Sequence, residues 1–143
     1  MAEFIYTPVQ TVSAGSPIAL NTAIPCNKGY IYHRNGSGIV TLRGIVNCQS
    51  ACYARYRVEF SGNIAIPEGG TVGPISVAVT LDGETLESSR AITTPTAAEA
   101  FYNVTSAAMI IVPKGCCFNV SIDNTSNQAI DVQNANLSVT RIA

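Results

Sequence analysis

The chain has 143 residues, of which 47% are hydrophobic and only 12% are charged, and its formal net charge is −1. Average soluble proteins carry about 25% charged residues, so we expect this chain to hide part of its surface in a contact between subunits. No apolar run approaches the roughly 18 residues of a membrane helix. The eight Lys and Arg residues are scattered along the sequence, which argues against binding to nucleic acid.

The first part of the chain predicts short strands. Residues 4–12 are β-prone, and Pro8 places them at the edge or the entry of a sheet. Residues 30–34 and 38–46 are predicted to pair as a hairpin. The dipeptide Asn35-Gly36 between them favours a two-residue turn, because both central turn positions need positive φ.

The clearest strand pattern covers residues 52–66. Ala54, Tyr56, Val58 and Phe60 share one face, and Tyr53, Arg55, Arg57 and Glu59 share the other. This alternation is typical of a strand with one buried face and one wetter face. Residues 75–81 alternate in the same way, and Asp82-Gly83 after them predicts a second hairpin turn.

The rest of the chain predicts three more strands. Residues 93–99 are expected to form a loop or one helical turn at most. Residues 101–112 are apolar on both faces, so we expect both faces to be covered. Residues 114–142 predict two strands joined by a polar turn. The apolar phase shifts around Gln133-Asn134, which predicts a bulge in the last strand.

These strands recur every ~8–15 residues between turn signals, with no helix of substantial length. The pattern predicts an all-β fold, a two-sheet jelly-roll sandwich of about 8–10 antiparallel strands. The length suits a single domain covering residues 1–143.

The residue types that carry catalysis do not form a recognisable group. His33 is the only histidine, and we expect it to be solvated or locally hydrogen-bonded rather than to act as a general base. The carboxylates of Glu84, Glu87, Asp123 and Asp131 lie near turns and are expected to be solvated. We therefore expect no catalytic residues, no cofactor and no metal, and the protein is not expected to be an enzyme.

The five cysteines are Cys26, Cys48, Cys52, Cys116 and Cys117. The first twelve residues lack the pattern of a signal peptide, so we expect synthesis in the cytoplasm and no disulfide framework. The cysteines are expected to act as small buried hydrophobic residues, with Cys116 and Cys117 packing on opposite faces. The alternative is a disulfide between Cys52 and either Cys116 or Cys117.

Three stretches carry a resemblance to a known family: VQTVSAGSPIALNT, CYARYRVEFSGNIAI and CCFNVSIDNTSNQAIDVQNANLSVTRIA. Together they resemble the tumour necrosis factor-like and complement-head superfamily of trimeric jelly rolls. The likeness is to its bacterial and phage branch, which includes the heads of bacterial collagen-like surface proteins and virion proteins of gut phages. The resemblance implies a jelly roll, a homotrimer and no enzymatic activity.

The resulting expectation is a structural protein that decorates a phage capsid or another part of a virion surface. It would be made in the cytoplasm of the bacterial host, and its partners would be further copies of itself and the major capsid protein or another virion protein. No partner membrane or nucleic acid is expected. Four residues are predicted to form the trimer interface: Tyr56, Phe101, Tyr102 and Phe118.

The alternative function is a trimeric recognition head, such as a fibre tip or a surface adhesin. Such a head would bind a host glycan or receptor through its loops, and three copies would gain avidity without a tight single site. The candidate loops are residues 47–52, 67–74 and 82–99.

Overall fold

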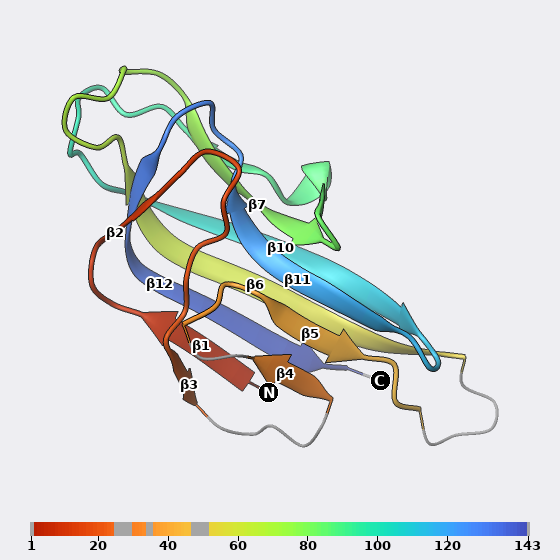
Figure 1. The fold of residues 1–143 in the computed structure, drawn as a ribbon. Helices are drawn as coiled ribbons and strands as arrows, with labels where there is room; N and C mark the ends of the chain where they lie inside the picture. Colours follow the sequence, from red (N-terminus) through yellow and green to blue (C-terminus); the bar gives the residue numbers. More distant parts are fainter. Residues whose placement is uncertain (1, 25–29, 34–35, 47–51, 143) are drawn as a thin grey trace.

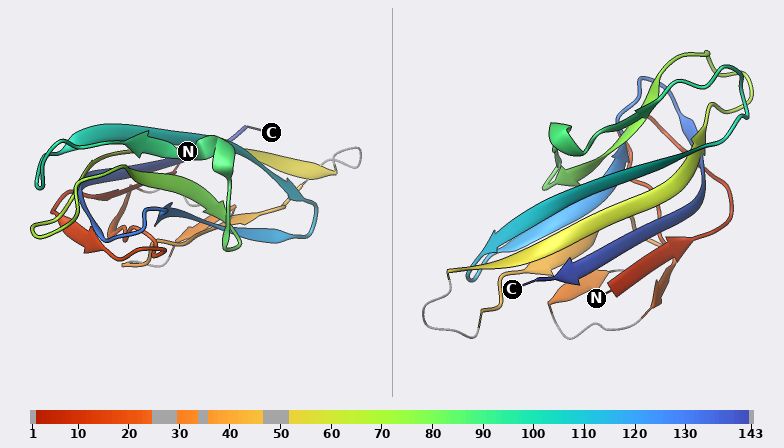
Figure 2. Two further views of the ribbon diagram at one scale, coloured as in Figure 1. Left: turned by 90° about the horizontal axis from the view of Figure 1, so that it is seen from above. Right: turned by 180° about the vertical axis from the view of Figure 1, so that it is seen from behind.

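A computed structural model describes residues 2–24, 30–33, 36–46 and 52–142. These residues form two antiparallel sheets that face each other, as Figure 1 and the view from above in Figure 2 show. The predicted all-β, two-sheet jelly roll is confirmed. The described residues contain twelve strands, more than predicted because several have only two or three residues, and one 3-10 turn at Glu87–Ser89. None of their helical segments is long and apolar enough to cross a membrane.

The first sheet, called sheet A here, contains the two ends of the described chain. Its strand order is β10-β6-β12-β1-β3, and β2 pairs with the free part of β12. The bounds of these strands are β1 Ala2–Tyr6, β2 Gln10–Val12, β3 Thr22–Ile24, β6 Tyr53–Ala65, β10 Tyr102–Pro113 and β12 Ile130–Arg141.

The second sheet, sheet B, has the order β4-β5-β11-β7-β8, and β9 pairs with β7. The bounds of its strands are β4 Ile31–His33, β5 Val40–Arg43, β7 Ile75–Leu81, β8 Glu84–Thr85, β9 Ala91–Thr93 and β11 Cys117–Asn124. Strand β10 of sheet A leads through a tight turn into β11 of sheet B. We call this connection the β10–β11 hairpin, although the two strands belong to different sheets, and it joins the two layers at one end of the sandwich.

The core lies between the sheets and follows the period of two along each strand. In β6, every even-numbered side chain from Ala54 to Phe60 is buried and every odd-numbered one from Tyr53 to Glu59 is exposed, as predicted. The largest fully buried side chains include Phe4, Tyr56 and Phe60. Burial of one such side chain stabilises the fold by about 1.5–3 kcal/mol.

Two predicted backbone features are confirmed. Asp82 (φ 48°) and Gly83 (φ 88°) both have positive φ in the turn between β7 and β8. The pairing of β12 with β6 shifts register between Gln133 and Asn136. Asn134 lies inside that shift with φ 55°, which is a left-handed conformation that Asn tolerates better than most residues.

Two other predictions need correction or remain partly outside the described residues. The segment 4–12 is an edge only in part. Strand β1 lies between β12 and β3 in sheet A, whereas β2 pairs with β12 alone among the described strands. Pro8 falls in the break between β1 and β2, where its missing N–H costs no ladder bond. Strands β4 and β5 pair antiparallel as predicted, but Asn35 of the turn between them lies outside the described residues.

Candidate assembly surface

The outer face of sheet A carries a cluster of exposed apolar side chains at the end near the β10–β11 hairpin. We call it the outer patch, and it consists of Tyr53, Met109, Ile111 and Ile142, which are 40%, 50%, 52% and 50% exposed. Ile111 pairs with Arg55 of β6, and the backbone of Ile142 bonds to the other side of Arg55. The patch therefore crosses three neighbouring strands.

The rest of this outer face is mostly polar, and it includes the exposed, ion-paired side chains of Arg57 and Glu59. It presents Ser61, Thr105, Ala107, Asn136 and Ser138 in adjacent positions of β6, β10 and β12. The Asn136 amide donates a hydrogen bond of 2.6 Å to the Glu3 carboxylate. The short side chains are grouped beyond Glu59, so another sheet or strand can approach that part of the face more closely than the part with Arg57 and Glu59.

Strand β10 is an end strand of sheet A among the described strands, and it is twelve residues long. Its middle is fixed by the Ser106 hydroxyl, which donates a hydrogen bond to the backbone oxygen of Ser89 in the 3-10 turn. Long edge strands with apolar side chains tend to pair with other chains, and natural proteins usually cover them. Met109 and Ile111 lie in the half of β10 beyond Ser106, toward the hairpin.

The prediction that Tyr56 lies in the trimer interface needs correction. Its side chain is fully buried between the sheets of its own chain, and its hydroxyl donates a 2.6 Å hydrogen bond to the backbone oxygen of Arg43. Burial raises the pKa of Tyr56, although the nearby Arg141 guanidinium acts against that rise. A side chain without accessible surface cannot contact a neighbouring subunit, so the prediction for Tyr56 is wrong.

The other three predicted interface residues occupy two different places. Phe101 and Tyr102 are more than a third exposed at the beginning of β10. Phe118 lies on β11 of sheet B and packs partly against the core. The structure thus places Tyr102 on the same strand as Met109 and Ile111 and Phe101 directly before that strand, whereas Phe118 lies in the other sheet. A contact between subunits at these residues stays a prediction.

Sequence reasoning missed the outer patch, although a signal for it was present. Residues 101–112 were recognised as apolar on both faces, and only one of those faces is covered by the chain itself. Met109 and Ile111 are the large apolar residues of the uncovered face in the paired part of β10.

The fold gathers positive charge at the same end of the sandwich. Of the Lys and Arg residues that the structure describes, all but Arg90 lie there: Arg43, Arg55, Arg57, Lys114 and Arg141. The Arg57 guanidinium forms an ion pair with Glu59, and that of Arg141 lies 4.3 Å from the centre of the Tyr30 ring. Residues scattered along the sequence therefore form one basic end in space.

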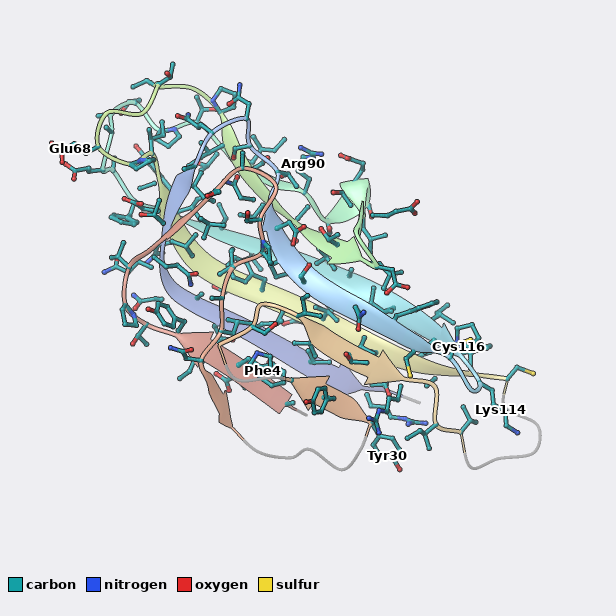
Figure 3. The ribbon with its side chains drawn as sticks, viewed as in Figure 1. Phe4, Tyr30, Glu68, Arg90, Lys114 and Cys116 are labelled. Carbon is teal, nitrogen blue, oxygen red and sulfur yellow. The ribbon has the colours of Figure 1, made fainter. Side chains whose placement is uncertain are left out.

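The prediction that the cysteines are buried also needs correction at this end of the molecule. Cys52, Cys116 and Cys117 are exposed and free in the described structure rather than buried, and no disulfide joins them. They lie beyond the end of the core, where β6 begins and β10 turns into β11. Figure 3 shows Lys114 and Cys116 at this hairpin, at the opposite end of the molecule from Glu68. Cys26 and Cys48 lie outside the described residues.

The residues considered for chemistry have local partners. His33 Nε2 lies 2.7 Å from the backbone oxygen of Ser37, and its ring centre lies 4.6 Å from that of Phe4; the local hydrogen bond was predicted. Arg90 donates two hydrogen bonds to Glu87, and these lower the pKa of the Glu87 carboxyl. Within the described ranges, no three His, Cys, Asp or Glu side chains are placed to hold a metal ion.

An open pocket of about 580 Å³ lies at the end opposite the hairpin. Residues 71–76, Arg90, Ile92 and residues 125–128 line it. The Gln128 side chain joins two of its walls, because its amide nitrogen donates a 2.7 Å hydrogen bond to the backbone oxygen of Thr71. The pocket thus has polar groups and a cation beside the apolar side chains of the loops.

Comparisons with known proteins connect this fold to a known structural class. No model of a known protein family matches the sequence, and a search of curated proteins finds no match. Solved structures with a similar fold include three that cover nearly the whole chain, at 11–13% sequence identity. Eiger TNF from S. frugiperda has a TM-score of 0.67, covering 100% of this chain and 92% of that one.

The other two similar structures cover this chain almost completely. Murine APRIL at pH 5.0 gives a TM-score of 0.66, covering 99% of this chain and 98% of that one. The globular domain of zebrafish complement 1qA gives 0.60, covering 96% and 94%. The fold expected from the resemblance to tumour necrosis factor-like and complement heads is therefore confirmed. None of these three proteins comes from a bacterium or a phage.

Proposed function

We propose that this chain is a non-enzymatic structural protein that forms a homotrimer through the outer face of sheet A and decorates the surface of a phage virion. The observation that carries the proposal is the outer patch on a long edge strand. Met109 and Ile111 are each about half exposed, on a face whose remaining side chains are mostly polar. A second copy of the chain would bury both the patch and the edge.

The proposal of three subunits rests on the family resemblance of the sequence, which implies a trimer. The fold shared with Eiger TNF and the complement 1qA domain supports that resemblance. The low charge content of 12% also supports assembly, because subunit interfaces of obligate oligomers resemble a domain core cut in half.

The place on a virion is tested with purified particles. Quantitative mass spectrometry of a purified virion that contains this chain would give its copy number relative to the major capsid protein. Decoration predicts a number comparable to the number of capsid subunits. A complete absence from particles would overturn the virion role, and a few copies per particle would favour a fibre tip instead.

The alternative function, a recognition head, is favoured by the open pocket at the far end of the sandwich. The pocket uses residues of two predicted recognition loops, 67–74 and 82–99, and two of its lining side chains, Val72 and Ile92, are more than half exposed. A glycan array tests this alternative. Binding that is lost in Arg90→Ala would support recognition, and an array without any bound glycan would count against it.

A further inference from the structure

Two of the exposed cysteines have a cation directly opposite them on the neighbouring strand. Cys117 of β11 pairs with Arg43 of β5. The backbone N–H of Lys114 donates a 2.9 Å hydrogen bond to the backbone oxygen of Cys52. That bond continues the β6–β10 ladder beyond the Tyr53–Pro113 pair, so Lys114 lies opposite Cys52.

Directly opposed residues on antiparallel strands share a face of the sheet, and their Cβ atoms are about 4.5–5.5 Å apart. An Arg or Lys side chain is long enough to reach a group attached to the opposite sulfur. Cys116 provides an internal comparison. It is also exposed, but it lies opposite Gly44, whose N–H bonds to the Cys116 oxygen over 2.8 Å.

The exposure of these thiols is unusual, because free cysteine is among the most buried residue types. The proposed assembly leaves Cys117 accessible. Its side chain is on the outward face of β11 in sheet B, with the exposed Asn119, whereas the outer patch belongs to sheet A. Trimer formation and a reaction at Cys117 therefore use different faces of the sandwich.

We propose that Cys117 and Cys52 are thiol modification sites for small anionic disulfides of the glutathione class. The thiolate of the protein attacks one sulfur of the small disulfide. A protein–small-molecule disulfide forms, the original sulfur–sulfur bond breaks, and the second half leaves as a thiolate that takes up a proton. The protein sulfur is oxidised, the departing sulfur is reduced, and the reverse exchange with excess thiol restores the cysteine.

The cations provide the selectivity. Arg43 and Lys114 attract the carboxylates of an approaching anionic disulfide, and after the reaction they lie beside the carboxylates of the attached group. Nearby positive charge from the rest of the basic end acts in the same direction. A cationic disulfide of similar size is repelled by the same groups.

The test compares three reagents on the native full chain: oxidised glutathione (anionic), hydroxyethyl disulfide (neutral) and cystamine (cationic). Intact mass and peptide mapping measure the rate of modification at each cysteine. After correction for the intrinsic reactivity of each reagent toward a small thiol, Cys117 and Cys52 should favour the anionic reagent by about twofold to fivefold, the range expected from one exposed ion pair. Cys116 should show a smaller preference, and added salt should reduce all of them.

Charge-reversed variants connect the preference to the named cations. Arg43→Glu should make Cys117 react faster with the cationic than with the anionic reagent and leave the rates at Cys52 unchanged. Lys114→Glu should have this effect at Cys52 and leave the rates at Cys117 unchanged. Arg43→Gln and Lys114→Gln are the milder variants if a reversal impairs folding, and the salt dependence of the wild-type protein needs no variant at all. Unreactive Cys117 and Cys52, or rates independent of reagent charge, would overturn the inference.

This inference does not depend on the trimer or on the virion role. The molecular mass of the reduced protein in solution tests assembly separately from the exchange rates. Peptide mapping also separates adducts on Cys26 or Cys48 from those on the two proposed sites.

Discussion

The hydroxyl of Tyr56 ties the middle of sheet A to the backbone of sheet B, since it donates its bond to the Arg43 oxygen. We expect Tyr56→Phe to lower the free energy of unfolding by about 1–2 kcal/mol, because the partly buried backbone oxygen of Arg43 loses this hydrogen bond. The trimer should persist, since the side chain has no accessible surface. Urea unfolding and light scattering of the variant check both statements. If the variant dissociates but keeps the stability of the wild type, Tyr56 contacts a neighbouring subunit after all.

Tyr56 should also make the free energy of unfolding depend on pH. The folded-state pKa of Tyr56 is raised, so its stabilising effect is fully present below the unfolded value of about 10 and is lost as the pH rises through the folded pKa. The stability difference between the wild type and Tyr56→Phe should therefore shrink above a pH of about 10. A stability difference that grows with pH would show that the pKa of Tyr56 is not raised in the folded protein.

Asn124 is a second buried polar residue with a structural role. It is fully buried, and its amide nitrogen donates to the backbone oxygens of Val12 (3.0 Å) and Gln128 (2.8 Å) while its side-chain oxygen accepts from Ser126 (2.9 Å). Asn124→Ala should cost about 2–4 kcal/mol, because several buried groups lose partners at once. The exposed neighbour Asn127→Ala is the control and should change stability by less than about 0.5 kcal/mol. Equal effects in urea unfolding would contradict this role.

At the level of single residues, the alternation in β6 was enough to predict which side chains share a face. It did not decide which face meets another subunit, and so Tyr56 was placed in the interface by mistake. The cysteines were expected to be buried because their residue type usually is. Where the core ends depends on the register of β5, β6, β10 and β11, which the sequence alone does not specify.

The last strand, β12, depends on a bulge for the position of its apolar residues. Val132 precedes the register shift and Leu137 follows it, and both are buried. The change of apolar phase made this bulge predictable, because a strand without it would turn one half of its apolar side chains outward. The pairing of β1 in the interior of sheet A was not predictable from Pro8, since the chain breaks at that residue and both halves pair separately.

The left-handed backbone of Asn134 gives this bulge a test. Asn134→Val should lower the free energy of unfolding by about 1–2 kcal/mol, because a β-branched side chain is strained at positive φ. Asn134→Gly is the matched control and should leave stability within about 0.5 kcal/mol of the wild type. Thermal or urea unfolding measures both. Equal stability of the Val and Gly variants would mean that the bulge is absent in solution.

The whole molecule has two dissimilar ends. The hairpin end carries the outer patch, the basic residues and three exposed thiols, and the far end carries the loops and the open pocket. The jelly roll itself was predictable from short strands and turn chemistry. The clustering at the hairpin end was not, because the residues involved come from five strands and turns that are distant in sequence and meet only through sheet register.

A charged residue in the outer patch should prevent assembly. Ile111→Lys would place an ammonium group opposite Arg55 in the proposed interface. Desolvation of a charge without an opposite partner costs several kcal/mol, so the protein should become monomeric with its fold intact. Ile92→Lys is the control, since Ile92 is 62% exposed on sheet B at the far end. Circular dichroism and light scattering of the two variants check this prediction. A trimeric Ile111→Lys protein would exclude the outer patch from the interface.

The most direct test of the central claim is the mass of the native, reduced protein in solution. Sedimentation equilibrium or light scattering at micromolar concentration should give three times the mass of one chain, with no dependence on added reductant. A protein with the mass of a single chain under these conditions would contradict assembly through the outer face of sheet A.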